Sequence, residues 1–452
     1  MTKKPAFILI FLWIVIVGSC GSGFAQENSN TYQPSVENLQ ARQWFQDAKF
    51  GIFIHWGVYS LMAGAGEKDV AEWIMEEKQI PIDKYERLPG YFNPVKFNAD
   101  QWVNKIKASG AKYITITSKH HDGFAMYDSN VSDYDIVDST PFKRDILKEL
   151  KAACDKQGIK LFFYYSQLDW HHPDYYPRGR TGNVYTGRAE KGDWDRYIDY
   201  QNAQLKELLT NYGAIGGIWF DGWWDQEKGP MKDRWRLEET YKLIHDLQPH
   251  ALIINNHHVK PYPGEDVQPF EQDLPGENDA GFNTTFISNR MPLEMAQTMN
   301  GSWGFNLIDD RFKSTKELIQ NLVGAAGRNS NYLMNTGPMP DGQIQEENIQ
   351  TYNEMGEWLK IYGESIYGTR GGPVGPRPWG VTTQKGNVIY VHVMDWQDSQ
   401  FILPMKGMEI ADVTMLKDGQ KVDFKKGDDH IILTLAKEAW QEWDAVIKIT
   451  MK

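Results

Sequence analysis

The chain has very little cysteine, with two residues in 452, Cys20 and Cys154. Cys20 lies in an N-terminal segment that reads as an export signal, so we expect no structural disulfide in the mature chain. Cys154 lies in "RDILKELKAACDKQG", on the same helical face as Ile146, Leu147 and Leu150. This pattern predicts a buried thiol in a hydrophobic core, without a catalytic role.

Positive charge is also scarce, because 48 Lys and Arg residues face 60 Asp and Glu residues. The formal net charge of −12 disfavours a polyanionic partner, so we expect no nucleic-acid binding.

Long hydrophobic runs are missing apart from one near the N-terminus, Ala6 to Val17. Lys3 and Lys4 precede it and small residues follow, as in an export signal whose apolar core is too short to span a membrane. We predict a signal peptide over residues 1–25, a periplasmic protein and no transmembrane span in the mature chain. A second possibility stays open: "VGSC" ends at Cys20 like a lipoprotein box, which would leave a lipid-anchored chain.

Nucleotide-binding motifs are absent: the strands carry no GxGxxG turn, and there is no P-loop lysine motif. What recurs is an amphipathic helix followed by an apolar strand, as where "NADQWVNKIKASG" leads into "AKYITITSKHHDG" and "YQNAQLKELLTNYG" leads into "AIGGIWFDGWW". This alternation is typical of a buried parallel sheet. We therefore predict an α/β fold, a TIM-like (β/α) barrel over residues 36–368.

The residue pattern changes near residue 369. Short alternating stretches such as "GNVIYVHVMDW" and "DHIILTLA" lie between Gly- and Pro-rich turns. They predict a C-terminal β-sandwich over residues 369–452. Packing support and sugar binding are both possible roles for it.

Unusual side chains stand where the predicted barrel strands end. The strands deliver His55, the pair His120 and His121, Tyr164, and Asp221. Because the carboxyl ends of barrel strands share one rim, we expect these side chains to meet in a single site.

A metal centre is the first alternative for a rim rich in histidine. His120 and His121 are adjacent and diverge from a strand end, and neither an HxH pair nor HExxH is present. We therefore expect no metal and no cofactor. A second alternative is a purely structural rim of hydrogen-bonded histidines. Neutral His, Tyr and Trp together better suit a polyhydroxylated ligand, which hydrogen-bonds to imidazoles and covers ring faces.

Asp221 stands in "GGIWFDGWWDQ", between Trp219, Trp223 and Trp224. A carboxylate walled by indoles costs free energy unless it is used or paired. Glycoside hydrolysis needs two carboxyl groups beside one bond, and a short, fixed Asp suits the nucleophile. The alternative, a helix cap, fits poorly because "DGWWDQ" does not resemble a helix start.

The motifs "KFGIFIHWGVYS", "TSKHHDGFAMYDS", "FYYSQLDW", "WFDGWW", "MNGSWGFN" and "NYLMNTGPMPDG" resemble those of the α-L-fucosidases of glycoside hydrolase family 29, in the expected order over residues 38–370. The resemblance implies exo-acting, metal-independent hydrolysis of terminal α-L-fucose from glycans, with retention through a covalent fucosyl-enzyme intermediate. It implies Asp221 as the nucleophile. It also implies that the substrate is bound by His55, Glu72, Trp73, His120, His121, Tyr164, Trp219, Trp224 and Trp303.

For the acid/base the resemblance leaves three candidates, because the family varies at this position. Glu277, in "DLPGENDAGFN", is our prediction, since a mobile loop suits a group that switches from acid to base. Glu294, in "PLEMAQTMNGSWGFN", is the alternative acid/base, although it also reads as the start of a helix-like stretch. Glu271 is the third candidate.

Two other functions stay open at this point. The enzyme could accept sugars that differ from L-fucose around C6. A non-catalytic fucose-binding lectin on the same barrel is the alternative from another class.

Overall fold

The computed structural model describes residues 32–66, 70–182, 187–188, 190–283, 285–396, 398–435 and 443–452. The predicted signal peptide and Cys20 lie outside these residues. All elements described below belong to one unit, Pro34–Lys452. Within the described residues, no helix is both long and apolar enough to cross a membrane.

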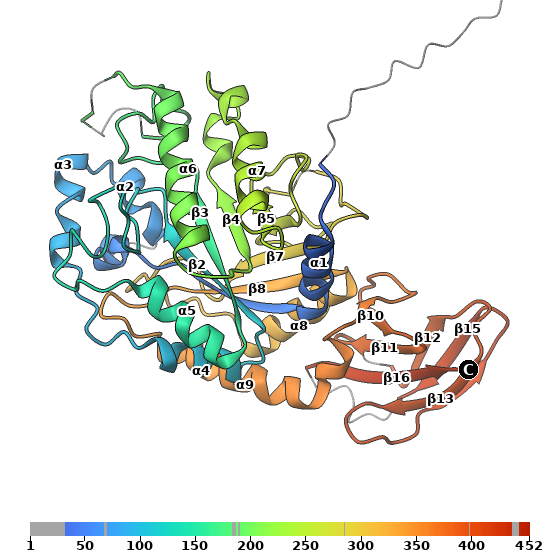
Figure 1. Cartoon of the computed structure of the whole chain (residues 1–452). Helices are drawn as coiled ribbons and strands as arrows, with labels where there is room; N and C mark the ends of the chain where they lie inside the picture. Colours follow the sequence, from blue (N-terminus) through green and yellow to red (C-terminus); the bar gives the residue numbers. More distant parts are fainter. Residues whose placement is uncertain are drawn as a thin grey trace, which may run out of the picture. The chain divides into compact units, whose positions relative to one another are not determined.

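Eight parallel strands form the larger sheet (Figure 1), in the order β5-β4-β3-β2-β1-β8-β7-β6. Their bounds are β1 Phe50–Ile54, β2 Tyr113–Lys119, β3 Lys160–Ser166, β4 Gly217–Asp221, β5 Leu252–Asn255, β6 Gln268–Glu271, β7 Leu293–Thr298 and β8 Ser330–Thr336. A parallel bridge between Ile254 and Val267 connects the two end strands β5 and β6. The sheet therefore closes, and the predicted TIM-like barrel is confirmed.

Side chains alternate between the two faces of each barrel strand. In β1, Phe53 belongs to the cluster that fills the barrel, whereas Ile52 and Ile54 belong to the core between the strands and the helices. In β3, Phe162 and Tyr164 point inward in the same way. Because both faces are buried, these strands read as continuous apolar runs in the sequence.

Helices surround the barrel strands (Figure 1). Their bounds are α1 Val36–Ala48, α2 Ile74–Glu77, α3 Ile82–Tyr85, α4 Ala99–Ala108, α5 Ile146–Gln157, α6 Trp194–Thr210, α7 Leu237–Leu247, α8 Thr315–Gly327 and α9 Glu346–Tyr362. The sequence sets their ends: α5 begins at the N-cap Asp145, whose side chain accepts from the Lys148 amide, and ends at Gly158 in the left-handed conformation. Its Cys154 is a buried free thiol, as predicted.

Two barrel connections lack a helix. Among the described residues of 256–267 and 272–292, which join β5 to β6 and β6 to β7, there are only turns and extended backbone. This side of the barrel is therefore built from loops.

Helix α1 closes the end of the barrel that lies opposite the carboxyl ends of the strands. Phe45 is fully buried, with ring centroids 5.2 Å from Tyr113 and 5.9 Å from Phe162. Helix α1 therefore completes the floor of the barrel interior.

The C-terminal strands are antiparallel and form two sheets, β13-β16-β11-β10-β9 and β12-β15-β14. Their bounds are β9 Arg370–Gly371, β10 Gly380–Lys385, β11 Val388–Val393, β12 Gln400–Pro404, β13 Ile410–Met415, β14 Asp423–Lys426, β15 His430–Thr434 and β16 Ala445–Met451. The first residue of β9, Arg370, follows soon after the predicted boundary at residue 369. Val381, Tyr390 and Val446 of these strands belong to the same hydrophobic cluster as the barrel core.

Candidate active site

Asp221 ends β4 with both carboxylate oxygens hydrogen-bonded. The indole Nε1 of Trp224 donates to Oδ1 at 2.8 Å, and the Tyr164 hydroxyl donates to Oδ2 at 2.9 Å. Only 14% of the side chain is exposed, and burial raises its pKa while these two donors lower it. The carboxylate is thus fixed in orientation but still open to a ligand.

The chain turns sharply after Asp221. Gly222 has φ +88°, and a Cβ at this position would lie 2.7 Å from the backbone nitrogen of Leu168. Only glycine fits both conditions, which explains the Asp-Gly pair at the end of the strand.

The tautomer of His121, whose Nε2 lies nearest to the Asp221 carboxylate, follows from its hydrogen bonds. Its Nδ1 lies 2.7 Å from the Ser166 hydroxyl, which itself donates to the Leu168 carbonyl at 2.5 Å. Ser166 must therefore accept from His121, so the proton is on Nδ1 and Nε2 is an acceptor. Nε2 lies 3.8 Å from Asp221 Oδ2, and burial holds the His121 pKa well below its usual value.

The tautomer of His55 can be assigned in the same way. Its Nδ1 lies 2.7 Å from the side-chain oxygen of Asn335, whose amide donates to the Trp303 carbonyl at 2.7 Å. Burial lowers the His55 pKa to about 3. His55 and His121 are thus neutral acceptors, suited to the hydroxyl groups of a sugar.

Glu72, on the 3₁₀ turn Ala71–Trp73, supplies the complementary donor. Its Oε2 accepts from the Gly304 amide at 2.8 Å, whereas its buried Oε1 has no hydrogen-bond partner in the protein. Burial raises the Glu72 pKa to about 8. This raised pKa favours the protonated form, in which the carboxyl can donate to a bound ligand.

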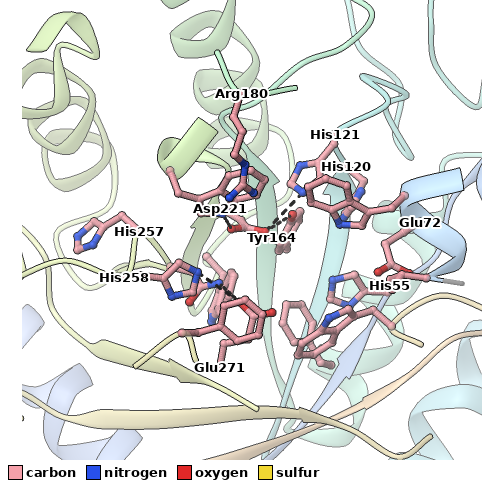
Figure 2. A pocket seen from close by; sticks show the side chains of 18 of the residues that line it. His55, Glu72, His120, His121, Tyr164, Arg180, Asp221, His257, His258 and Glu271 are labelled. Carbon is pink, nitrogen blue, oxygen red and sulfur yellow. Dashed lines mark hydrogen bonds and ion pairs between the residues drawn. The ribbon is translucent and has the colours of Figure 1, made fainter. Parts of the chain in front are cut away.

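Aromatic rings form the walls. Trp73 stacks on Trp224 with centroids 5.6 Å apart, and Tyr164 stacks on Trp219 at the same centroid distance. Together with the polar groups they line a cavity of about 440 Å³ (Figure 2). Such a mixture of apolar faces and fixed polar groups is typical of a small-molecule site.

The structure brings Asp221 and all nine predicted substrate-binding residues to this cavity. The nine are His55, Glu72, Trp73, His120, His121, Tyr164, Trp219, Trp224 and Trp303.

Glu271, the last residue of β6, brings a further carboxyl group to the cavity. The Asn256 amide donates to its Oε2 at 2.8 Å, and His258 Nε2 lies 3.4 Å from the same oxygen. Burial raises the Glu271 pKa, and the Glu271 charge in turn raises the Asp221 pKa. Figure 2 shows Glu271 beside His258, across the cavity from His121.

The placement of Glu277 argues against its predicted role. Its carboxylate accepts from Arg328 at 2.6 Å, just beyond the end of α8, and the residue does not line the cavity. The arginine contact gives Glu277 no place in the cavity lining in this structure, and the acid/base role of Glu277 stays a prediction.

Glu294 does not reach the cavity either. It lies on β7, not at the start of a helix, and is fully buried inside the barrel. The Tyr113 hydroxyl donates to one oxygen at 2.7 Å and the Trp219 indole to the other at 2.8 Å. It therefore lies on the far side of Trp219 from a ligand.

Several lining residues were not predicted. They are Phe53, Val70, Glu77, Arg180, Glu227, Asn256, His257, His258, Glu271, Gly281 and Phe282, of which only Glu271 had been considered, as the third acid/base candidate. The stretch "LIINNHH" carries Asn256, His257 and His258 directly after β5, so the rule applied to the other strand ends would have found them. Arg180 lies on a long loop and leaves no such signal.

The described residues include no group of three His, Cys, Asp or Glu side chains placed to hold a metal ion. The chemistry available in the cavity is that of carboxyl groups, imidazoles, indoles and the Arg180 guanidinium.

Comparison with known proteins agrees with this chemistry. The Alpha-L-fucosidase family profile matches residues 22–364. The chain is 33% identical to alpha-L-fucosidase isoenzyme 1 from Paenibacillus thiaminolyticus, covering 92% of this chain and all of that one, with a TM-score of 0.81. It is 29% identical to human plasma alpha-L-fucosidase, covering 88% of this chain and 86% of the human protein.

A further solved structure captures a reaction intermediate. It is a trapped covalent intermediate of an alpha-L-fucosidase GH29 from Bacteroides thetaiotaomicron, formed with 2-fluoro-fucosyl fluoride in a glutamate-to-glutamine mutant. That protein is 27% identical, with coverage of 93% and 97% and a TM-score of 0.79.

Proposed function

This chain belongs to the α-L-fucosidase family of glycoside hydrolases, and from that premise we propose that it removes terminal α-L-fucose from glycans by an exo-acting, retaining mechanism. The observation that carries the proposal is the pair of partly exposed carboxyls, Asp221 and Glu271, in one cavity with the neutral His55 and His121.

In the first step, Asp221 attacks the anomeric carbon of fucose and the bond to the leaving oxygen breaks. Glu271 transfers its proton to that oxygen, so the leaving sugar departs as a neutral alcohol. In the second step, Glu271, now ionised, takes a proton from water. The water oxygen attacks the anomeric carbon, Asp221 is released, and two inversions give net retention.

The environments of the two carboxyls support these roles. Asp221 accepts two hydrogen bonds, which favour its ionised form, whereas Glu271 accepts one and is raised in pKa mainly by burial. Ionisation of either group disfavours ionisation of the other. The state with Asp221 charged and Glu271 protonated is the one that the first step requires.

The cavity also supports exo-action and selectivity for a deoxy sugar. His55 and His121 present acceptors and Glu72 presents a donor to one sugar unit, and Trp219 and Phe53 close the inner end. One terminal residue fits such an arrangement, with its hydroxyls on the polar side and its apolar carbons against the indoles.

Trapping of the intermediate tests the proposal. Incubation with 2-fluoro-fucosyl fluoride is expected to inactivate the enzyme and to add one 2-fluorofucosyl group to the peptide that contains Asp221. Proton NMR of a normal turnover should show α-fucose as the first-formed product. Labelling of a different residue, or β-fucose appearing first, would contradict the mechanism, and a lectin would bind fucose without any turnover.

A further inference from the structure

Arg180 lies at the cavity without a role in the mechanism above. It stands on the loop between β3 and α6, and its guanidinium carbon lies 4.4 Å from the centroid of the Trp224 ring. Figure 2 shows Arg180 reaching toward Asp221, apart from His55 and Glu72. It therefore belongs to the part of the cavity beside the bond to be cleaved.

The guanidinium is available to a ligand. Although Glu77 and Glu227 line the same cavity, Arg180 forms no ion pair with any carboxylate in the described part of the chain. A guanidinium that stacks on an indole keeps its N–H donors free at its edge. Trp224 in turn donates to Asp221, so these donors lie one side chain away from the nucleophile.

An apolar group lines the cavity near Glu271. Phe282 stacks on His258 with ring centroids 5.5 Å apart, and His258 lies against Glu271. Phe282 is 40% exposed and Arg180 is exposed, whereas His55, His120 and Glu72 are buried. The exposed lining residues thus lie where a leaving group would emerge.

We propose, resting on the proposed function, that Arg180, Trp224 and Phe282 form the subsite for the leaving sugar, and that Arg180 donates to oxygen acceptors of a neutral sugar. The charge of the cavity favours a neutral sugar. Glu72 and Glu271 are protonated in the mechanism above, but Asp221 and Glu227 also line the cavity, so carboxylates still outnumber Arg180 and would repel an anionic group.

The test compares two substrates that differ only in the leaving group: α-L-fucosyl fluoride, which has no leaving sugar, and a fucosylated neutral disaccharide. Arg180→Ala is expected to lower kcat/KM on the disaccharide about 10- to 100-fold, since charge-assisted hydrogen bonds are lost. Hydrolysis of the fluoride should stay within about twofold. Arg180→Lys should restore part of the loss, and Arg178→Ala on the same loop, outside the cavity lining, is the matched control.

Three outcomes would overturn the inference. An equal loss on both substrates would mean that Arg180 only supports Trp224 and Asp221. An unchanged disaccharide rate would mean that Arg180 does not touch the leaving sugar. A preference for uronic-acid or sulfated leaving sugars that disappears in salt would contradict the neutral subsite. If the wild-type enzyme does not hydrolyse the fluoride at all, the proposed function itself fails, and this inference fails with it.

Discussion

At the scale of single residues, the two carboxyls assigned to the reaction, Asp221 and Glu271, differ in their hydrogen-bond partners. Asp221 is fixed by an indole and a phenol, and Glu271 by one amide. Because it accepts one hydrogen bond where Asp221 accepts two, Glu271 can change between its protonated and ionised forms more readily than Asp221, as an acid/base must.

This difference predicts the behaviour of Glu271→Gln. On a natural glycan, whose alcohol leaves poorly without a proton, kcat/KM should fall about 10²- to 10⁴-fold. An aryl fucoside with a good phenolate leaving group should lose far less in its first step, and azide should then give a fucosyl azide of retained configuration. Glu277→Gln, which breaks only the contact with Arg328, is the matched control and should remain near wild type. The reverse pattern would restore Glu277 as the acid/base.

The pH profile gives a second readout of the same residue. Because burial raises the Glu271 pKa, the group keeps its proton to a higher pH than an exposed glutamate does. Activity on the natural glycan should therefore fall at high pH as Glu271 ionises, and this alkaline limb should disappear in the residual activity of Glu271→Gln. An alkaline limb that persists in the variant would assign it to another group.

Glu294 has a different consequence, for stability. Burial raises its pKa to about 7 from 4.5. A pKa raised in the folded state contributes stability at pH values below 4.5, and this contribution is lost as the pH rises from 4.5 through 7. The change amounts to about 3 kcal/mol, at 1.36 kcal/mol per pKa unit.

The matching experiment follows Glu294→Gln and the wild type from pH 4.5 to 8 by thermal unfolding. Other groups titrate equally in both proteins, so the difference isolates Glu294. The variant should gain stability relative to the wild type as the pH rises. A difference that does not vary with pH would show that Glu294 stays ionised in the folded protein.

At the scale of elements, α1 closes one end of the barrel with the side chain of Phe45. Phe45→Ala removes a fully buried ring from between Tyr113 and Phe162 and should cost about 3–5 kcal/mol of unfolding free energy. Leu39→Ala on the same helix, where the side chain is 52% exposed, is the control and should change stability by less than about 0.5 kcal/mol. Equal effects in thermal unfolding would mean that α1 does not seal the barrel.

The elements also explain what sequence reasoning could and could not find. Strands β1 to β4 are rich in apolar and β-branched residues, so the positions of His55, His120 and Asp221 at or just after their ends, and of Tyr164 near the end of β3, followed directly. Strand β6 is only "QPFE", half buried and with a proline, so nothing marked Glu271 as a strand end.

The remaining misses come from contacts between distant segments. Glu294 resembled a helix start because local pattern carries no information on Tyr113 and Trp219, its hydrogen-bond donors on other strands. In the same way, Glu277 pairs with Arg328, which lies 51 residues away in the sequence. Arg180 reaches the cavity only through the path of its loop.

At the scale of the whole molecule, the C-terminal strands share a core with the barrel. Val381 of β10 is buried and packs so closely on Gly327 of α8 that a Cβ added to Gly327 would lie 2.5 Å from the Val381 Cβ. Val381→Asp would place an unpaired charge in this shared core and should lower the melting temperature of the barrel as well as of the sandwich. Loss of sandwich signal alone, with fucoside hydrolysis surviving heat as in the wild type, would show that the two parts are independent.

The loops that replace helices after β5 and β6 have a consequence for synthesis. They carry His258 and Phe282, next to the proposed leaving-sugar subsite, while buried partners brace the fucose-binding side chains on the strands. Every step of a retaining mechanism can be run backwards, so a subsite that releases one sugar also receives another in place of water. Exchanging these loops between relatives would then alter which acceptor captures the intermediate and leave the recognition of fucose intact. The half of the cavity without helices is thus where a hydrolase of this kind can be converted into a catalyst that builds fucosylated glycans.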